Sequence, residues 1–175
     1  VHAQPLVEAG FRVVTWDMPG HGGAGGKTSA LPYFARAIEL VAQEFGPVHG
    51  IVAHSLGSAA TSLALSQGLQ ARRLVYLAPP ENLARYLIFL GKVLRFAPSI
   101  GPRALELLEK RYETSLEEVR GRSLAPYRHE PLLILHDEKD RDVPLDEARE
   151  IARVWPGARI VESRGLGHGR IVRDE

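Results

Sequence analysis

The amino-acid sequence predicts an α/β fold with a mostly parallel sheet flanked by helices. Three stretches, 48–53, 73–78 and 131–136, are short apolar runs without polar alternation, which is typical of strands covered by helices on both faces. The segments between predicted strands are long enough for the helical crossovers that parallel pairing needs. Ligands of such sheets bind at the carboxyl ends of the strands. The residues that follow each strand are therefore the candidates for function.

The composition is that of a folded domain with balanced charge. The chain has 175 residues, of which 45% are hydrophobic and 25% charged, and its formal net charge is +1. This balance argues against nucleic acid as a partner, because phosphate backbones require a basic surface. The absence of cysteine excludes disulfides and thiolate catalysis. No apolar run reaches the length of a membrane span and no signal peptide is visible, so a cytoplasmic location is the default expectation.

Strands and helices alternate along the first part of the chain. Between Phe11 and Trp16, β-branched and aromatic residues predict a strand. The apolar residues Phe34, Ile38 and Phe45 recur at helical spacing and predict an amphipathic helix. The expected order is a helical tail at 5–9, a strand at 11–16, a helix at 32–45, a strand at 48–53, a helix at 56–67 and a strand at 73–78.

Residues 81–128 contain two or three helical stretches, around 83–96, 103–112 and 116–120, and no strand signal. After them we expect a strand at 131–136, a helix at 146–154, a strand at 158–162 and a last helix from about Arg170. The expected organisation is therefore a core of residues 1–80 and 129–175 interrupted by a helical insertion at 81–128. Its apolar residues Tyr86 to Leu90 would line the inner face of the insertion and meet an acyl or alkyl group.

A serine occupies the predicted turn between the strand at 48–53 and the next helix. In Ala53-His54-Ser55-Leu56-Gly57 the residues two positions either side of Ser55 are small, as a nucleophile elbow requires where strand and helix approach closely. Ser55 would face the positive end of the helix dipole, and the free N–H of Leu56 could bind an oxyanion. A serine that only caps its own helix would fit the same pattern.

An acidic loop and a histidine loop follow two later strands. Asp140 is the first candidate for the acid that orients an imidazole, and Asp142 is the second. His168, in a glycine-rich loop, would lie at the same edge of the sheet. The order Ser55, Asp140, His168 is that of the Ser-acid-His hydrolase template. The sequence therefore predicts a nucleophilic serine with a histidine base.

These motifs together resemble the α/β-hydrolase fold family of serine hydrolases, which includes esterases and lysophospholipases. Asp17–Gly22 is similar to its D-x-P-G-H-G loop, His136–Pro144 to its acid loop and Gly165–His168 to its G-x-G-H loop. The resemblance covers residues 5–175 and favours Asp140 over Asp142 as the acid. It implies a helical lid at 81–128, hydrolysis of a small-molecule ester, thioester or amide, and no cofactor.

Both ends of the chain are expected to be cut, because it begins at Val1 without a methionine and stops at Glu175 in what reads as the opening of a helix. The resemblance adds what is missing at the first end. In the family, a strand and an H-G loop precede the helix whose tail lies at 5–9, and that loop supplies the other oxyanion donor. The missing strand would lie between the strands at 11–16 and 48–53. We therefore expect this chain alone to be unstable and nearly inactive.

Two other classes of function fit parts of the sequence. Gly22–Thr28 nearly matches a phosphate-binding P-loop, but His21 stands where the first glycine is required. An α/β-hydrolase-like domain that binds a partner without turnover would use the apolar residues of the insertion instead. A metal site is not indicated, because the seven histidines show no H-E-x-x-H spacing. Structural roles are expected for His49, His54, His129 and His136.

Overall fold

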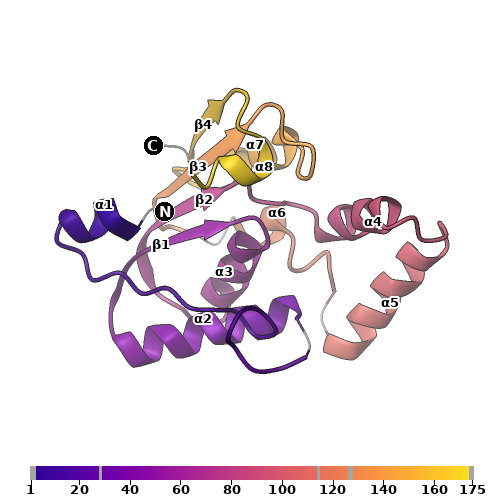
Figure 1. Ribbon diagram of the computed structural model, residues 1–175, viewed down its shortest axis with the longest axis horizontal. Helices are drawn as coiled ribbons and strands as arrows, with labels where there is room; N and C mark the ends of the chain where they lie inside the picture. Colours follow the sequence, from indigo (N-terminus) through magenta and orange to yellow (C-terminus); the bar gives the residue numbers. More distant parts are fainter. Residues whose placement is uncertain (1–2, 28, 114, 126–127, 174–175) are drawn as a thin grey trace.

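The computed structural model describes residues 3–27, 29–113, 115–125 and 128–173. Its sheet has four parallel strands in the order β1-β2-β3-β4 (Figure 1). They are β1 (Val48–His54), β2 (Ala71–Leu77), β3 (Leu132–Asp137) and β4 (Arg159–Ser163). The four predictions for these strands are correct to within two residues at each end. The α/β fold class with a parallel sheet is thereby confirmed.

Helix α3 (Leu56–Ser66) connects β1 to β2, and α7 (Leu145–Val154) connects β3 to β4, as parallel pairing requires. Helices α1 (Ala3–Glu8) and α2 (Leu31–Phe45) precede β1, and α8 (Gly167–Arg170) follows β4. The last helix begins at Gly167, three residues before the predicted start. Among the described helices, none combines the length and the apolar character needed to cross a bilayer.

The predicted strand from Phe11 to Trp16 is wrong, because this segment forms no ladder with any described strand. A strand is held by its neighbours, and β1 pairs with β2 on one side only. Instead the segment runs past the amino end of β1. There the Phe11 and His49 rings lie 5.1 Å apart, and Arg12 donates a hydrogen bond to the carbonyl of Phe45.

The core consists of two apolar clusters. One joins the sheet to α3 and α7, and in it the rings of Tyr76 and Trp155 meet edge-on at 6.0 Å. The other joins α2, α3 and the start of α4. β3 is the most buried strand, which agrees with its uninterrupted apolar sequence. In β1 and β4, Val52 and Val161 remain about half exposed.

The segment between β2 and β3 carries α4 (Leu83–Val93), α5 (Ile100–Tyr112) and α6 (Gly121–Leu124). Figure 1 shows α4 and α5 projecting to one side of the sheet. The predicted helix at 116–120 is wrong: these residues form turns, and the helix starts at Gly121. The chain bends there because the Gly121 N–H donates to the carbonyl of Glu81, back at the start of the segment.

Charged side chains tie both ends of this segment to the core. Glu147 accepts hydrogen bonds from the backbone N–H groups of Glu81 (2.9 Å) and Asn82 (3.1 Å). Arg120, near the other end, makes a bidentate pair with Glu81 at 2.9 and 2.6 Å. Because Glu81 and Glu147 are buried, these charge-assisted bonds fix the place where α4 and α5 leave the core.

Candidate active site

Ser55 occupies the sharp turn between β1 and α3. Its φ of +50° and ψ of −125° lie where residues other than glycine are rarely found. The turn is held because the Ser55 N–H donates to the carbonyl of Leu77 and the Ser55 carbonyl accepts from the Ser58 N–H, both at 2.9 Å. A Cβ added at Gly57 would lie 3.9 Å from that of Ala53. Alanine at position 53 is thus compatible with the elbow.

Leu56 is the first residue of α3. The first N–H groups of a helix have no acceptor within the helix and point toward the positive end of the helix dipole. The Leu56 N–H, directly after Ser55 in the chain, is therefore one of the donors at the start of α3 without an acceptor inside the helix.

The side chain of Asp140, in the loop after β3, is fully buried. Its Oδ1 accepts the backbone N–H groups of Asp142 and Val143, both at 2.9 Å. Its Oδ2 lies 2.8 Å from Nδ1 of His168. The choice of Asp140 over Asp142 agrees with this geometry, because the backbone of Asp142 serves to hold the Asp140 carboxylate.

His168 lies between the other two residues. Its Nε2 is 3.0 Å from Ser55 Oγ, while its Nδ1 faces Asp140. The structure thus brings Ser55, Asp140 and His168 into one chain of hydrogen bonds, although 113 positions separate the serine from the histidine. Each follows the carboxyl end of a different strand, which is how the parallel sheet brings them to one edge.

The charge on Asp140 fixes the direction of these hydrogen bonds. Burial would raise the pKa of Asp140, but the His168 ring and the backbone N–H groups of Val143 and Asp142 hold it below its usual value. An ionised carboxylate only accepts, so His168 carries a proton on Nδ1. Its Nε2 is then free to accept the Ser55 hydroxyl proton. The same bond to Asp140 raises the pKa of His168 above 6.5, against the effect of burial.

His54 also contacts His168, a contact that its sequence position alone does not predict. Its Nε2–H donates to the backbone carbonyl of His168 at 3.0 Å, and the two rings lie 4.7 Å apart. Burial and the nearby His168 ring lower the pKa of His54, so it stays neutral beside a base that gains charge. Its position directly before Ser55 was the only signal for this role.

Asp137 anchors the loop that carries His168. This buried carboxylate accepts the Leu166 N–H at 2.8 Å and the Ser163 hydroxyl at 2.9 Å, and the Lys139 N–H also donates to it at 2.9 Å. Burial would raise the pKa of Asp137, but these hydrogen bonds hold it far below its usual value. The sequence shows four acids in one short loop, and no pattern separates this anchor from solvated neighbours.

His136 is also buried, next to Asp140. Its Nε2–H donates to the Val143 carbonyl at 2.9 Å and lies 3.5 Å from Asp140 Oδ2. Burial lowers the pKa of His136. A neutral ring there supports the acid loop without competing with His168 for the carboxylate charge.

An apolar pocket of about 160 Å³ opens beside Leu56, between the core and α4 and α5. From α4 and α5, Tyr86, Leu87, Leu108 and Tyr112 contribute to its wall. Of the apolar residues expected to face inward, Tyr86 and Leu87 line this pocket. Phe89 is half-buried but does not line it, and Ile88 is exposed. The side chain of Leu90 lies outside the described part of the structure.

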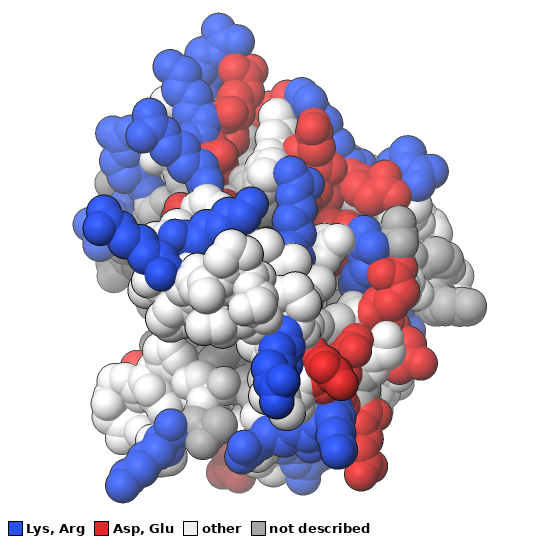
Figure 2. Space-filling model, turned by 90° about the vertical axis from the view of Figure 1, so that its right-hand side faces the viewer, with Lys and Arg blue, Asp and Glu red and all other residues white. Residues whose placement is uncertain are grey.

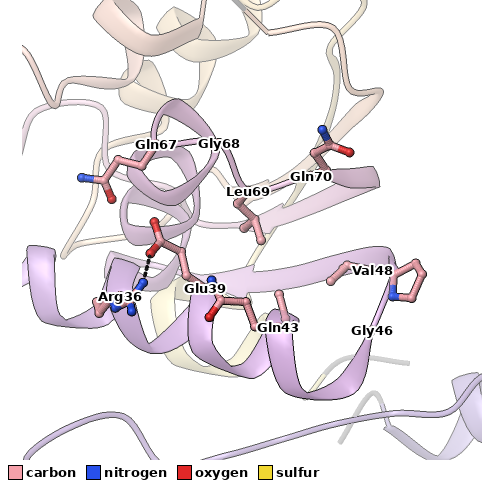
Figure 3. A pocket seen from close by; sticks show the side chains of 11 residues that line it. Arg36, Glu39, Gln43, Gly46, Val48, Gln67, Gly68, Leu69 and Gln70 are labelled. Carbon is pink, nitrogen blue, oxygen red and sulfur yellow. Dashed lines mark hydrogen bonds and ion pairs between the residues drawn. The ribbon is translucent and has the colours of Figure 1, made fainter.

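A larger, open hollow of about 480 Å³ lies at the amino ends of β1 and β2 (Figure 3). Gln43, Gln67 and Gln70 line it, together with the Arg36–Glu39 ion pair at 2.9 Å. Its lining has no serine, histidine or aspartate, and it lies at the opposite end of the strands from Ser55. It is therefore not part of this candidate site.

The glycine loop at 22–27 lacks the setting of a P-loop. No described strand precedes it, and α2 begins only at Leu31; Thr28 lies outside the described residues. Within the ranges that the structure describes, no three His, Asp or Glu side chains gather as metal ligands.

A parallel sheet with a serine on a strand-to-helix turn, followed by an acid and a histidine after two later strands, defines the α/β-hydrolase fold. The sequence also matches the model of the alpha/beta hydrolase family over residues 2–175. The chain belongs to this family. No curated protein matches it.

Solved structures of the same fold include a monoacylglycerol lipase, a protein named Est1E and an esterase. The monoacylglycerol lipase of Paleococcus ferrophilus is 21% identical, with a TM-score of 0.68 and coverage of 94% of this chain and 78% of the lipase. Est1E of Butyrivibrio proteoclasticus, solved with ferulic acid, is 21% identical, with a TM-score of 0.63 and coverage of 87% and 67%. An esterase of Exiguobacterium antarcticum is 16% identical, with a TM-score of 0.63 and coverage of 90% and 74%. At these identities the likeness extends to the fold alone.

Proposed function

We propose that the protein is a serine hydrolase that cleaves a carboxylic ester, thioester or amide through an acyl-enzyme. Ser55 Oγ attacks the carbonyl carbon while its proton passes to His168 Nε2. The Leu56 N–H binds the oxyanion, and the tetrahedral intermediate collapses as the leaving group takes the proton from His168. Water then attacks the acyl-enzyme by the same route and releases the acid and Ser55.

The observation that carries this proposal is the hydrogen-bonded series Asp140, His168, Ser55 with separations of 2.8 and 3.0 Å. These distances lie within the range needed for proton transfer from a nucleophile to a base that a third group orients. The strained backbone of Ser55 supports the same role, since strain of this kind gathers at functional sites.

The apolar pocket beside Leu56 points to an uncharged acyl group of modest size. Its volume of about 160 Å³ is similar to that of an engineered apolar cavity of about 150 Å³ that binds benzene. An acyl chain of about six carbons would fill a space of that order. We therefore place short and medium acyl esters ahead of long-chain ones when the substrate is presented in solution.

A panel of p-nitrophenyl esters from acetyl to palmitoyl, hydrolysed by the full-length protein, tests both parts of the proposal. We expect Ser55→Ala to lose nearly all turnover while folding normally by circular dichroism. We expect Leu108→Trp, which fills the pocket, to shift the preference toward shorter chains. Leu107→Trp on the exposed side of α5 is the matched control and should leave the preference unchanged.

Two results would count against the proposal. If Ser55→Ala hydrolysed the esters at the wild-type rate, Ser55 would not be the nucleophile. A folded wild-type protein that binds these esters without cleaving them would favour the non-catalytic binding domain instead.

A further inference from the structure

The turn that joins α4 to α5 is unusually exposed. Every residue from Lys92 to Ile100 is exposed; we call these nine residues the α4–α5 tip. In Figure 1 the tip lies at the far side of α4 and α5 from the sheet. Four large apolar side chains in it are 45–58% exposed: Val93, Leu94, Phe96 and Ile100.

So many apolar side chains on one exposed turn indicate a contact surface. They are separate from the pocket lining, since Tyr86 and Leu108 face inward from the same two helices. Figure 2 looks onto this side of the molecule and shows uncharged surface in its middle, with Lys and Arg beside it and Asp and Glu on its right-hand side. The tip projects away from the sheet (Figure 1), so it fits a partner that can deform around it.

The charged residues of the chain segment that contains the tip are all basic. From Leu83 to Leu105 the chain has four basic residues and no Asp or Glu. Arg85 lies 3.6 Å from Glu147, at the base of α4. For the other three, Lys92, Arg95 and Arg103, no ion pair with a described carboxylate is present. Basic residues beside exposed apolar ones complement a lipid bilayer with anionic headgroups, which carries negative charge at its surface and is apolar beneath.

We propose that the α4–α5 tip docks on the surface of an anionic lipid bilayer. Leu94 and Phe96 enter the boundary between headgroups and acyl chains, while Lys92 and Arg95 contact lipid phosphates. Apolar insertion and electrostatic attraction act together, because a single signal gives only weak and reversible binding. Docking requires no chemistry at Ser55.

Vesicle co-sedimentation of the full-length protein tests this proposal. The vesicles are pure phosphatidylcholine or an equimolar mixture with phosphatidylserine. We expect strong binding to the mixed vesicles, weakening as salt is raised. We expect Lys92→Gln/Arg95→Gln to bind the mixed vesicles roughly 25-fold more weakly, since each basic residue near an anionic surface contributes about fivefold. Leu94→Ser/Phe96→Ser should lose binding to both kinds of vesicle.

Matched controls separate docking from folding and from catalysis. Leu40→Ser removes an equally exposed apolar side chain on α2, and Arg153→Gln removes an exposed charge on α7. Both should bind as the wild type does, and circular dichroism should be unchanged in all variants. Ser55→Ala should also bind normally, so failure of docking and failure of the hydrolase proposal are distinguishable.

Three results would overturn the proposal. The wild type could fail to sediment with mixed vesicles even at low salt, or the tip variants could bind as well as it does. Gel filtration without lipid could instead show a dimer that Leu94→Ser/Phe96→Ser dissociates, which would assign the tip to a second copy of the chain.

Discussion

The ionised carboxylate of Asp140 sets the proton positions of the whole candidate site. It is buried and uses both oxygens, one for two backbone N–H groups and one for His168. The imidazole can therefore neither rotate away nor take the other tautomer without breaking a charge-assisted bond. This is the physical basis for treating His168 as a base directed at Ser55.

The raised pKa of His168 predicts the acid limb of the pH profile. A protonated imidazole cannot accept the Ser55 proton, so kcat/KM should fall as the pH drops through a midpoint above 6.5. Asp140→Asn removes the main cause of the raised pKa, so the limb should move to lower pH and the rate should fall on the order of 10⁴-fold. A kcat/KM profile from pH 5 to about 9 measures both effects.

Asp142→Asn is the control for this prediction, because Asp142 contributes its backbone N–H and not its carboxylate to Asp140. Its profile should resemble that of the wild type. A midpoint at or below 6.5 in the wild type, or a greater loss in Asp142→Asn than in Asp140→Asn, would contradict the assignment of the acid.

His54 is predicted to be a positioning residue for His168. His54→Phe keeps a ring against His168 but removes the donor to its carbonyl, so kcat should fall about tenfold, the effect of one net hydrogen bond. KM for a short ester should stay unchanged, since His54 does not line the pocket. His54→Gln retains an N–H donor and should recover most of the lost rate. An equal loss of kcat in His54→Phe and His54→Gln would indicate that His54 only packs against His168.

At the scale of elements, the loop at 17–23 depends on one glycine. Gly22 has φ +50°, and a Cβ there would lie 2.2 Å from Oδ2 of Asp17. That oxygen accepts the Gly23 N–H at 2.8 Å. We expect Gly22→Ala to lower the free energy of unfolding by about 1–3 kcal/mol, from backbone strain and the displaced carboxylate.

The matched control is Gly25→Ala, where the backbone is not left-handed and nothing lies within 4 Å of an added Cβ. It should change the free energy of unfolding by less than about 0.5 kcal/mol. Urea unfolding of the full-length protein measures both variants. Equal stabilities would show that the glycine at position 22 has no conformational role.

The elements that could be predicted from sequence are those with a local pattern and a neighbour to pack against. β3, an apolar run, and α2, with its helical spacing, both formed where expected. Residues 11–16 have the composition of a strand but no described strand to pair with, so the strand predicted from their composition does not form. Residues 116–120 fold into turns because Arg120 and Gly121 bond to Glu81, some 40 positions earlier in the chain, which no local pattern reveals.

In the molecule as a whole, the parallel sheet brings residues that are far apart in the sequence to one edge, because the carboxyl ends of all its strands lie there. The prediction that Ser55, Asp140 and His168 lie together needed only the knowledge that each follows a strand of one sheet. The contacts of His54 and Asp137 with the His168 loop could not be predicted, because they depend on how deeply each side chain is buried. The exposed α4–α5 tip was also hidden, because the sequence does not separate the inner from the outer face of the insertion.

The residue to which an electrophilic probe bonds identifies the nucleophile of the protein. A fluorophosphonate loses fluoride when a nucleophilic hydroxyl attacks its phosphorus, and peptide mass spectrometry then locates the adduct. We expect one adduct on Ser55 of the full-length protein, formed much more slowly in His168→Ala and at the same rate in Ser66→Ala, a control at the other end of α3. An adduct that persists in Ser55→Ala, or that forms on a different serine, would contradict this expectation.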